Sequence, residues 1–106
     1  MTQFPQEVHE RLRLYGERIK TARVRRRWSQ ASLAERIGVE RRSVIRLERG
    51  DAGVASGVLL AALWVLGLWE TTKAVADPAA DQAGIFLEKQ REPKRVGTKH
   101  RPELDF

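Results

Sequence analysis

The chain has 106 residues, of which 20 are Lys or Arg and 14 are Asp or Glu, so its formal net charge is +6. This length supports a single domain and excludes catalytic folds assembled from many parts, such as barrels and complete dinucleotide-binding domains. Because the sequence contains no cysteine, it also excludes disulfide scaffolds, thiolate zinc sites and cysteine nucleophiles.

The positive charge is concentrated in the first half of the chain. Residues 1–50 hold 13 Lys and Arg against 6 Asp and Glu, a net charge of +7. Residues 51–90 hold 2 against 5, and residues 91–106 hold 5 against 3. This division predicts that the first half meets an anion while the middle packs or dimerises. A solvated arginine surface is the alternative explanation of the same charge.

The spacing of apolar residues predicts helices throughout, since no segment alternates as a half-buried strand does. We expect a first helix over residues 5–27, either continuous or divided into two at Gly16. A second helix begins after Ser29, whose hydroxyl is a good N-cap. This helix ends at Gly38, where we expect the backbone to turn with a positive φ.

Two further helices are expected after the turn. One covers residues 41–49 and ends at Gly50, and the next covers residues 58–66 after Ser56 as its N-cap. The apolar run over residues 58–68 is shorter than the roughly 20 residues that span a membrane, so we interpret it as a core helix. No membrane association and no secretory signal are expected.

Composition changes towards the C-terminus. We expect a fifth helix over residues 69–76, a short extra helix over residues 79–90, and an extended tail from Arg91 onwards. The predicted fold class is therefore all-α: a five-helix repressor-type domain with a short extra helix and an extended C-terminal tail. The predicted domains are residues 1–76 and residues 77–106.

The second and third helices carry the features of a helix-turn-helix. Ala34 is the small residue that two closely crossing helices require, and Gly38 suits the tight turn between them. Apolar side chains of both helices are expected to seal the crossing: Leu33, Ile37, Val39, Val44 and Leu47. The opposite face of the third helix is then free to enter the DNA major groove.

The motif Gln30-Ala31-x-Leu33-Ala34, followed by Gly38 and by Ile45-x-Leu47-Glu48-x-Gly50, resembles the Xre-like (Cro/lambda-repressor-type) helix-turn-helix family. The resemblance covers about residues 15–68. It implies a regulator that binds double-stranded DNA.

The resemblance also implies which residues read bases. Arg41 and Arg42 match base-reading positions at the start of the third helix, and Ile45 and Arg46 share that face one turn later. Because arginine donates two hydrogen bonds to guanine O6 and N7, G·C-containing half-sites are expected. Ile45 either touches a thymine methyl group or packs inward. Glu40 either selects a cytosine amino group or caps the helix.

Other residues are expected to contact phosphate or to hold the fold together. The resemblance implies phosphate contacts for Gln30 and Ser43. Arg25 and Arg26 belong to a basic run at residues 25–27 that either contacts phosphate or forms a solvated face. The resemblance further implies a partly buried ion pair between Arg23 and Glu48, which would link the first helix to the third.

The sequence offers little for catalysis. His9 and His100 lie in the end regions without a neighbouring nucleophile or metal-ligand spacing. Asp77 and Asp81 form a lone pair of carboxylates, for which solvation or helix capping is a simpler explanation than metal binding. We therefore expect no enzyme, no catalytic residue, no metal and no cofactor.

The apolar middle of the chain is the natural surface for a homodimer, which a half-site reader needs for specificity. Trp64 and Trp69 are five residues apart, so they do not both fit one narrow helical stripe. We expect one of them at the dimer interface, where aromatic residues are enriched. The alternative is that both complete the core of the monomer.

A second resemblance involves the segment after the motif. Leu66 to Glu70, Asp77-Pro78, Gly84-Ile85 and Arg91 to Val96 together are similar to HipB-like antitoxins, which repress their own operon and bind a HipA-type kinase toxin. This implies that the C-terminal segment binds a partner and that the protein acts in the cytoplasm, at the nucleoid. The alternatives are a stand-alone Xre-type transcriptional regulator and a protein-interaction adaptor that no longer reads DNA.

Overall fold

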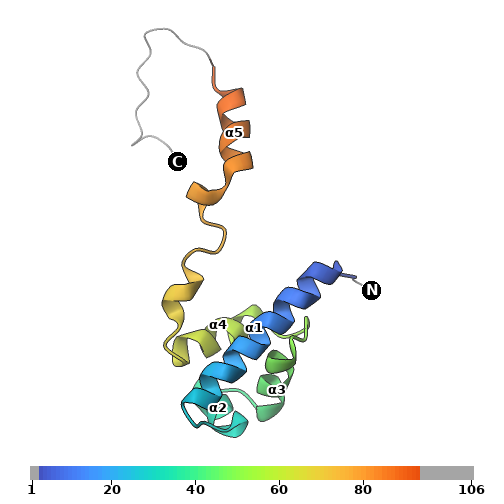
Figure 1. Cartoon of the computed structure of the whole chain (residues 1–106), viewed down its shortest axis with the longest axis vertical. Coiled ribbons are helices and arrows are strands. Elements are labelled where there is room, and N and C mark those ends of the chain that lie inside the picture. The colour runs from blue at the N-terminus through green and yellow to red at the C-terminus, as the bar shows by residue number, and fades with distance from the viewer. Residues whose placement is uncertain (1–2, 94–106) are drawn as a thin grey trace. The chain divides into compact units, whose positions relative to one another are not determined.

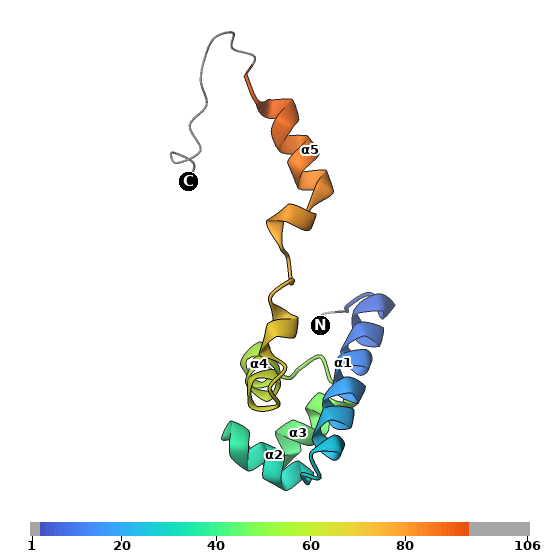
Figure 2. The same ribbon diagram turned by 60° about the vertical axis from the view of Figure 1, so that its left-hand side comes forward.

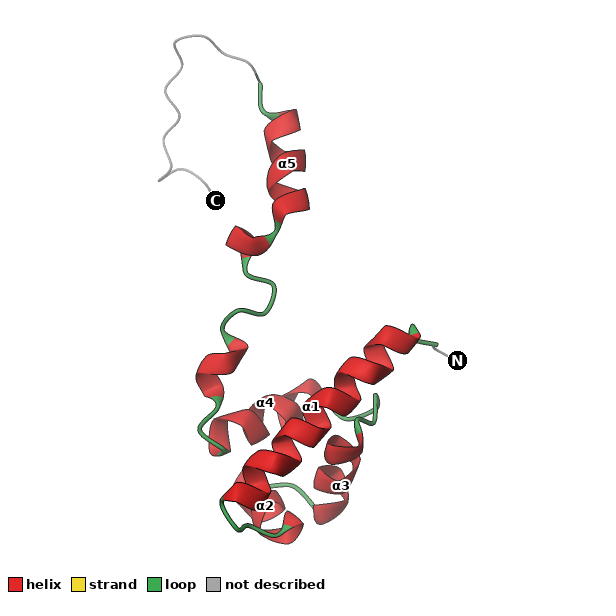
Figure 3. Cartoon of the chain, viewed as in Figure 1, coloured by secondary structure: helices red, strands yellow, loops and turns green. Residues whose placement is uncertain are grey.

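Helices account for all the regular structure in the computed structural model, which describes residues 3–93 (Figure 3). Five α-helices and two short 3₁₀ helices occur in this range, with no strand among them. The fold is therefore all-α, as predicted. The chain divides into two compact units, and the division falls between Lys73 and Ala74.

The first unit contains α1 (Gln6–Arg25), α2 (Gln30–Ile37), α3 (Arg41–Arg49), α4 (Ser56–Val65) and the 3₁₀ helix η1 (Trp69–Thr72). Figures 1 and 2 both show α2 and α3 beside the C-terminal half of α1, whose first turns extend past them. The four α-helices enclose a small apolar core, made up of Ile19, Ala22, Leu33, Ala34, Val44, Leu47, Ala62 and Leu66. This core holds α3 against both α1 and α2.

Two glycines allow α1 and the end of α3 to approach closely. Helix α1 is continuous, so the alternative of a division at Gly16 is wrong. A Cβ at Gly16 would lie 2.5 Å from the carbonyl oxygen of Glu48 and 2.7 Å from that of Leu47. Gly50 ends α3 with φ +79°, and a Cβ there would lie 2.6 Å from the backbone nitrogen of Arg13. At Gly16 the missing side chain therefore serves packing between helices rather than a break in one.

The elements after α3 differ in detail from the expectations. Ser56 is the first residue of α4 and its side chain does not cap the helix, because the N-cap position falls on Ala55. The expected fifth helix is one 3₁₀ turn, η1. The hydroxyl of Thr71 donates to the carbonyl of Leu68, and that of Thr72 donates to the carbonyl of Trp69. Such hydroxyl bonds compete with regular helical hydrogen bonding, which accounts for the short element.

The second unit contains η2 (Pro78–Ala80) and α5 (Gln82–Arg91). Both elements begin with an aspartate cap: Asp77 accepts from the backbone N–H of Ala79, and Asp81 accepts from that of Gly84, each at 2.9 Å. These two carboxylates therefore cap short helices. Most of the expected tail, including His100, lies outside the described residues.

Candidate nucleic-acid interface

Helices α2 and α3 form a helix-turn-helix whose local structure follows from three residues. The hydroxyl of Ser29 accepts the backbone N–H of Ser32 at 2.9 Å, which confirms Ser29 as the N-cap of α2. Gly38 ends α2 with φ +91°, a conformation that residues with a Cβ adopt reluctantly. Ala34 is only 3% exposed in the core between the helices. These features hold α3 at a defined angle to α2.

Helix α3 separates its side chains by face. Val44, Leu47 and Glu48 are buried, whereas the base-reading candidates Arg41, Arg42 and Arg46 are exposed. Ser43 and Ile45 are half-buried on the border between these faces. Ile45 is not among the apolar side chains that pack against the core, so its inward-packing alternative has no support in the structure. The outer face of α3 is therefore cationic and accessible.

Arg49 belongs to the same face and was not singled out by the sequence. It is exposed in the last turn of α3, three residues after Arg46 and seven after Arg42. Residues seven apart fall on nearly the same side of a helix, so this spacing was the available signal. Arg49 extends the cationic face by two turns beyond Arg42.

Glu40 precedes α3, and its carboxylate faces a neighbouring arginine. It occupies the N-cap position, as one of the two alternatives expected, but its side chain makes no capping hydrogen bond. Its carboxylate lies 3.5 Å from Nη2 of Arg42, and both side chains are at least 80% exposed. An ion pair this long and this solvated contributes little energy, so Arg42 remains available to another acceptor.

A buried polar network joins α1, α2 and α3. Arg23 donates from Nε to Glu48 Oε2 at 2.6 Å and from Nη2 to Oε1 at 3.0 Å, and the two side chains are 10% and 4% exposed. Arg23 also donates to the carbonyl of Trp28, and Gln30 donates its amide to Glu48 Oε1 at 3.1 Å. The carboxylate is thus satisfied by three donors, as a buried charge requires. The phosphate contact of Gln30 stays a prediction.

Two arginines at the end of α1 have different surroundings. Arg25 is exposed. Arg26 donates from Nη1 to the carbonyl of Ala22 and from Nη2 to the carbonyl of Leu66, each at 2.7 Å. It therefore ties the end of α1 to the end of α4, a structural role that the sequence did not indicate because its partner lies 40 residues away. Phosphate contacts of both arginines remain predictions.

Arg46 is held by a loop residue that sequence reasoning missed. Its Nε donates to Asp51 Oδ2 at 2.9 Å, and the backbone N–H of Gly53 donates to Asp51 Oδ1 at 2.6 Å. The hydrogen bond from Arg46, and then the one from Gly53, lowers the pKa of Asp51 below its ordinary value. The same contact raises the pKa of Arg46. Asp51 therefore stays ionised beside the cationic outer face of α3.

The tryptophans of the first unit differ in how far their side chains are exposed. Trp28 is half-buried against the core, with the guanidinium carbon of Arg36 3.9 Å from its ring centre. Trp64 is 66% exposed and Trp69 is 45% exposed, so the alternative that both complete the monomer core is wrong. Leu60, one turn before Trp64, is 41% exposed as well. Leu60 and Trp64 thus form an apolar patch on α4 that the described residues of the first unit leave exposed.

Within residues 3–93, we find no group of three His, Cys, Asp or Glu side chains arranged to hold a metal ion. None of the helices in this range has the length and apolar character needed to cross a membrane.

The fold and its exposed arginine face define a DNA-binding helix-turn-helix protein. Residues 14–75 match a family model described as a helix-turn-helix domain, and this match spans more than half of the chain. The chain therefore belongs to this helix-turn-helix family, of the Xre/Cro-like type. Members of the family are typically regulators rather than enzymes. No curated protein and no solved structure matches the chain.

Proposed function

We propose that the protein is a sequence-specific transcriptional repressor that inserts α3 into the DNA major groove, one helix per subunit of a homodimer. The observation that carries this proposal is the exposure of Arg41, Arg42 and Arg46 on a helix whose other face is packed into the core. A guanidinium donates two parallel hydrogen bonds to guanine O6 and N7, a pattern that only a G·C pair presents there. We therefore propose half-sites that contain guanine.

Phosphate contacts supply much of the affinity of such a protein. The first half of the chain carries the net positive charge. Ser43 lies in α3 between Arg42 and Arg46, and Arg25 is exposed at the end of α1, so we propose both as phosphate contacts. Neutralised phosphates release counterions, so the affinity of the parent chain should fall steeply as salt rises. An adaptor that no longer reads DNA would show neither this dependence nor a preferred sequence.

The DNA-binding proposal is tested with a duplex selected by the parent chain from a random library. The affinity of Arg42→Ala and Arg46→Ala for that duplex should fall by roughly 5- to 150-fold, since a good bidentate contact is worth about 1–3 kcal/mol. Arg18→Ala removes the same charge from an exposed position on α1 and is the matched control. If Arg42→Ala and Arg46→Ala bind the duplex as tightly as Arg18→Ala and the parent chain, base reading by α3 is refuted.

The uncovered apolar patch on α4 supports the homodimer. A dimer places two recognition helices on half-sites about 34 Å, one helical turn of DNA, or a multiple of that apart. We propose that Trp64, with Leu60 and with Trp69 close to it in sequence, contributes to the subunit interface. Burial of such aromatic side chains is characteristic of interface centres.

Sedimentation measurements test the dimer. The parent chain should sediment as a dimer, and Trp64→Ala should shift it towards monomer while its helical circular dichroism is unchanged. Val24→Ala is the matched control, because Val24 is a 54% exposed apolar residue on α1. A monomeric parent chain, or an unaltered dimer in Trp64→Ala, contradicts the proposed interface.

Exposed apolar residues in the second unit support a further proposal, that this unit binds a protein partner. No residue of α5 is buried within the described residues, and three consecutive apolar side chains are exposed there: Ile85, Phe86 and Leu87. Together with the resemblance to HipB-like antitoxins, this supports the proposal that the protein is the antitoxin of a HipA-type kinase and represses its own operon in the cytoplasm. A stand-alone regulator would bind no such kinase.

The neighbouring gene provides the first test, since an antitoxin should be co-transcribed with a HipA-type kinase. The two products should co-purify when expressed together, and Phe86→Ser should weaken the complex. Val75→Ser alters another exposed apolar residue of the same unit and serves as control, with the complex expected to survive. A kinase that does not bind the parent chain would reject the antitoxin role.

A further inference from the structure

The end of α3 and the loop after it form one hydrogen-bonded unit around Arg46. Gly50 donates its backbone N–H to the carbonyl of Leu47 at 3.1 Å, and Asp51 donates its own to the carbonyl of Arg46 at 3.0 Å. These two bonds, with the left-handed conformation of Gly50, make a Schellman motif. The first and last residues of that motif often touch through apolar side chains. Here the same two positions, Arg46 and Asp51, form an ion pair instead.

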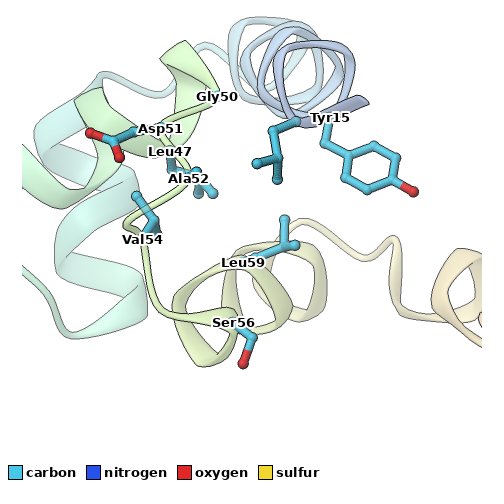
Figure 4. Close-up of a pocket in the computed structure, with 9 residues that line it drawn as sticks. Tyr15, Leu47, Gly50, Asp51, Ala52, Val54, Ser56 and Leu59 are labelled. Atoms are coloured by element: carbon cyan, nitrogen blue, oxygen red, sulfur yellow. The ribbon is translucent and has the colours of Figure 1, made fainter. Parts of the chain in front are cut away.

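The loop that carries Asp51 is itself anchored. Val54 packs against the core, and its backbone N–H donates to the carbonyl of Asp51 at 3.3 Å. Behind the loop lies a pocket lined mainly by apolar side chains, among them Tyr15, Leu47 and Leu59. Figure 4 shows the carboxylate of Asp51 pointing away from Tyr15 and Leu59. The carboxylate therefore projects from a supported backbone towards Arg46.

This arrangement restricts how Arg46 presents its guanidinium. Asp51 accepts from Nε, so the two Nη groups are left for another acceptor. Gly53 lies against the guanidinium, because a Cβ at that position would be 2.8 Å from Arg46 Nη2. Arg42 has no comparable support, since its contact with Glu40 is 3.5 Å long and highly exposed. Arg46 is thus the better oriented of the two.

We propose that Asp51 is a positioning residue that determines specificity: it orients Arg46 so that its two Nη groups meet O6 and N7 of one guanine. This proposal rests on the proposed function. An arginine ordered before binding loses less side-chain freedom when it meets the base. A carboxylate beside it also repels the phosphates of badly aligned sites, which is a way of rejecting the wrong partner. Asp51 thereby favours the correct base without contacting it.

The test measures discrimination at single base pairs. A duplex is selected with the parent chain, and each of its G·C pairs is replaced in turn by A·T. Dissociation constants are measured by fluorescence anisotropy for the parent chain, Asp51→Ala, Arg46→Ala and the double variant. Glu17→Ala, which removes the same charge from an exposed position on α1, is the matched control. Circular dichroism and thermal unfolding establish that each variant is folded.

We expect Asp51→Ala to lose about tenfold in discrimination at one G·C pair, the pair at which Arg46→Ala also loses discrimination. Its affinity for unrelated duplex should be unchanged or higher, because a negative charge is removed. In the Arg46→Ala background, Asp51→Ala should have no further effect at that pair. A residue with only a structural role would lower affinity for every duplex alike.

Three outcomes overturn the proposal. Equal discrimination by Asp51→Ala and the parent chain rejects the positioning role while the proposed function stands. Tighter and more selective binding by Asp51→Ala shows that Asp51 withholds Arg46 from DNA. A parent chain that selects no sequence overturns both the proposed function and the role of Asp51.

Discussion

Replacing Gly16 with alanine should destabilise the helix-turn-helix domain, although the same change stabilises most helices. Glycine in a helix interior is about 1 kcal/mol less favourable than alanine, so α1 by itself would gain from the substitution. In the folded domain, however, the new Cβ would lie 2.5 Å and 2.7 Å from the carbonyl oxygens of Glu48 and Leu47. Both contacts are with backbone, which does not move aside as a flexible side chain does.

The size of this destabilisation follows from the distance by which α1 and α3 must move apart to accommodate the new Cβ. Ordinary contacts of a Cβ begin near 3.4 Å, so α1 and the end of α3 must separate by up to about 0.9 Å. A gap of that order forfeits a quarter to a half of each dispersion contact across the interface, and overpacking of this kind costs about 1–3 kcal/mol or more. Separation also stretches the buried hydrogen bonds between Arg23 and Glu48. After the gain in helix propensity is subtracted, we expect the free energy of unfolding to fall by about 2 kcal/mol.

Urea and thermal unfolding, followed by circular dichroism, measure this loss. For a domain of this size, about 2 kcal/mol corresponds to a fall of roughly 8–16 °C in Tm. Gly57→Ala is the matched control, since a Cβ in that first turn of α4 would have no neighbour within 4 Å. It should be neutral or slightly stabilising. If Gly16→Ala is as stable as the parent chain, the close approach of α1 and α3 is wrong.

Three other predictions concern single interactions. Arg23→Met should cost about 3–5 kcal/mol in urea unfolding because it strands a buried carboxylate, and adding Glu48→Leu should recover most of that loss; a double variant no more stable than the single one contradicts this account. The carboxyl of Asp51, followed by NMR, should titrate below 3.8 and move upward in Arg46→Ala. Because the pKa of Asp51 is lowered in the folded state, its ionised carboxylate stabilises the fold above the ordinary pKa, and this stabilisation is lost as the pH falls through the folded-state pKa. A titration midpoint that is unchanged in Arg46→Ala would contradict the contact. Ser29→Ala should cost about 1 kcal/mol and Ser29→Gly only a few tenths, whereas equal stability of all three chains would remove the N-cap role.

The helix-turn-helix was predictable because its signals are local. Ser29, Gly38 and Gly50 act on backbone groups within a few residues of themselves, so their roles as cap and turns were correctly predicted. The apolar spacing of Leu33 and Val44 likewise reports which face of each helix is buried. Such features depend on neighbours in the sequence and need no knowledge of the fold.

Other assignments failed or were missed because they depend on the geometry of the folded chain, whether the residues concerned are near or far apart in sequence. Gly16 indicated a break in α1 when read locally, whereas its importance comes from the carbonyl of Glu48, 32 residues later in the numbering. Ser56 carried a capping side chain, yet the helix began one residue too early for it to cap. Asp51 had no recognisable signal, because its effect comes from pairing with Arg46 across a turn.

The sequence by itself determined that this is a cationic, all-helical chain with a helix-turn-helix and several arginines on the second helix of that motif, α3. It did not determine what each arginine does, because all of them carry the same charge and donors. The tertiary structure decided this by supplying acceptors: Glu48 for Arg23, the carbonyl of Leu66 for Arg26, and Asp51 for Arg46. Arg23 and Arg26, whose acceptors lie on other helices or at their ends, hold the fold together, whereas Arg46 and its carboxylate partner stay on the exposed face of α3, where we propose that Arg46 reads DNA.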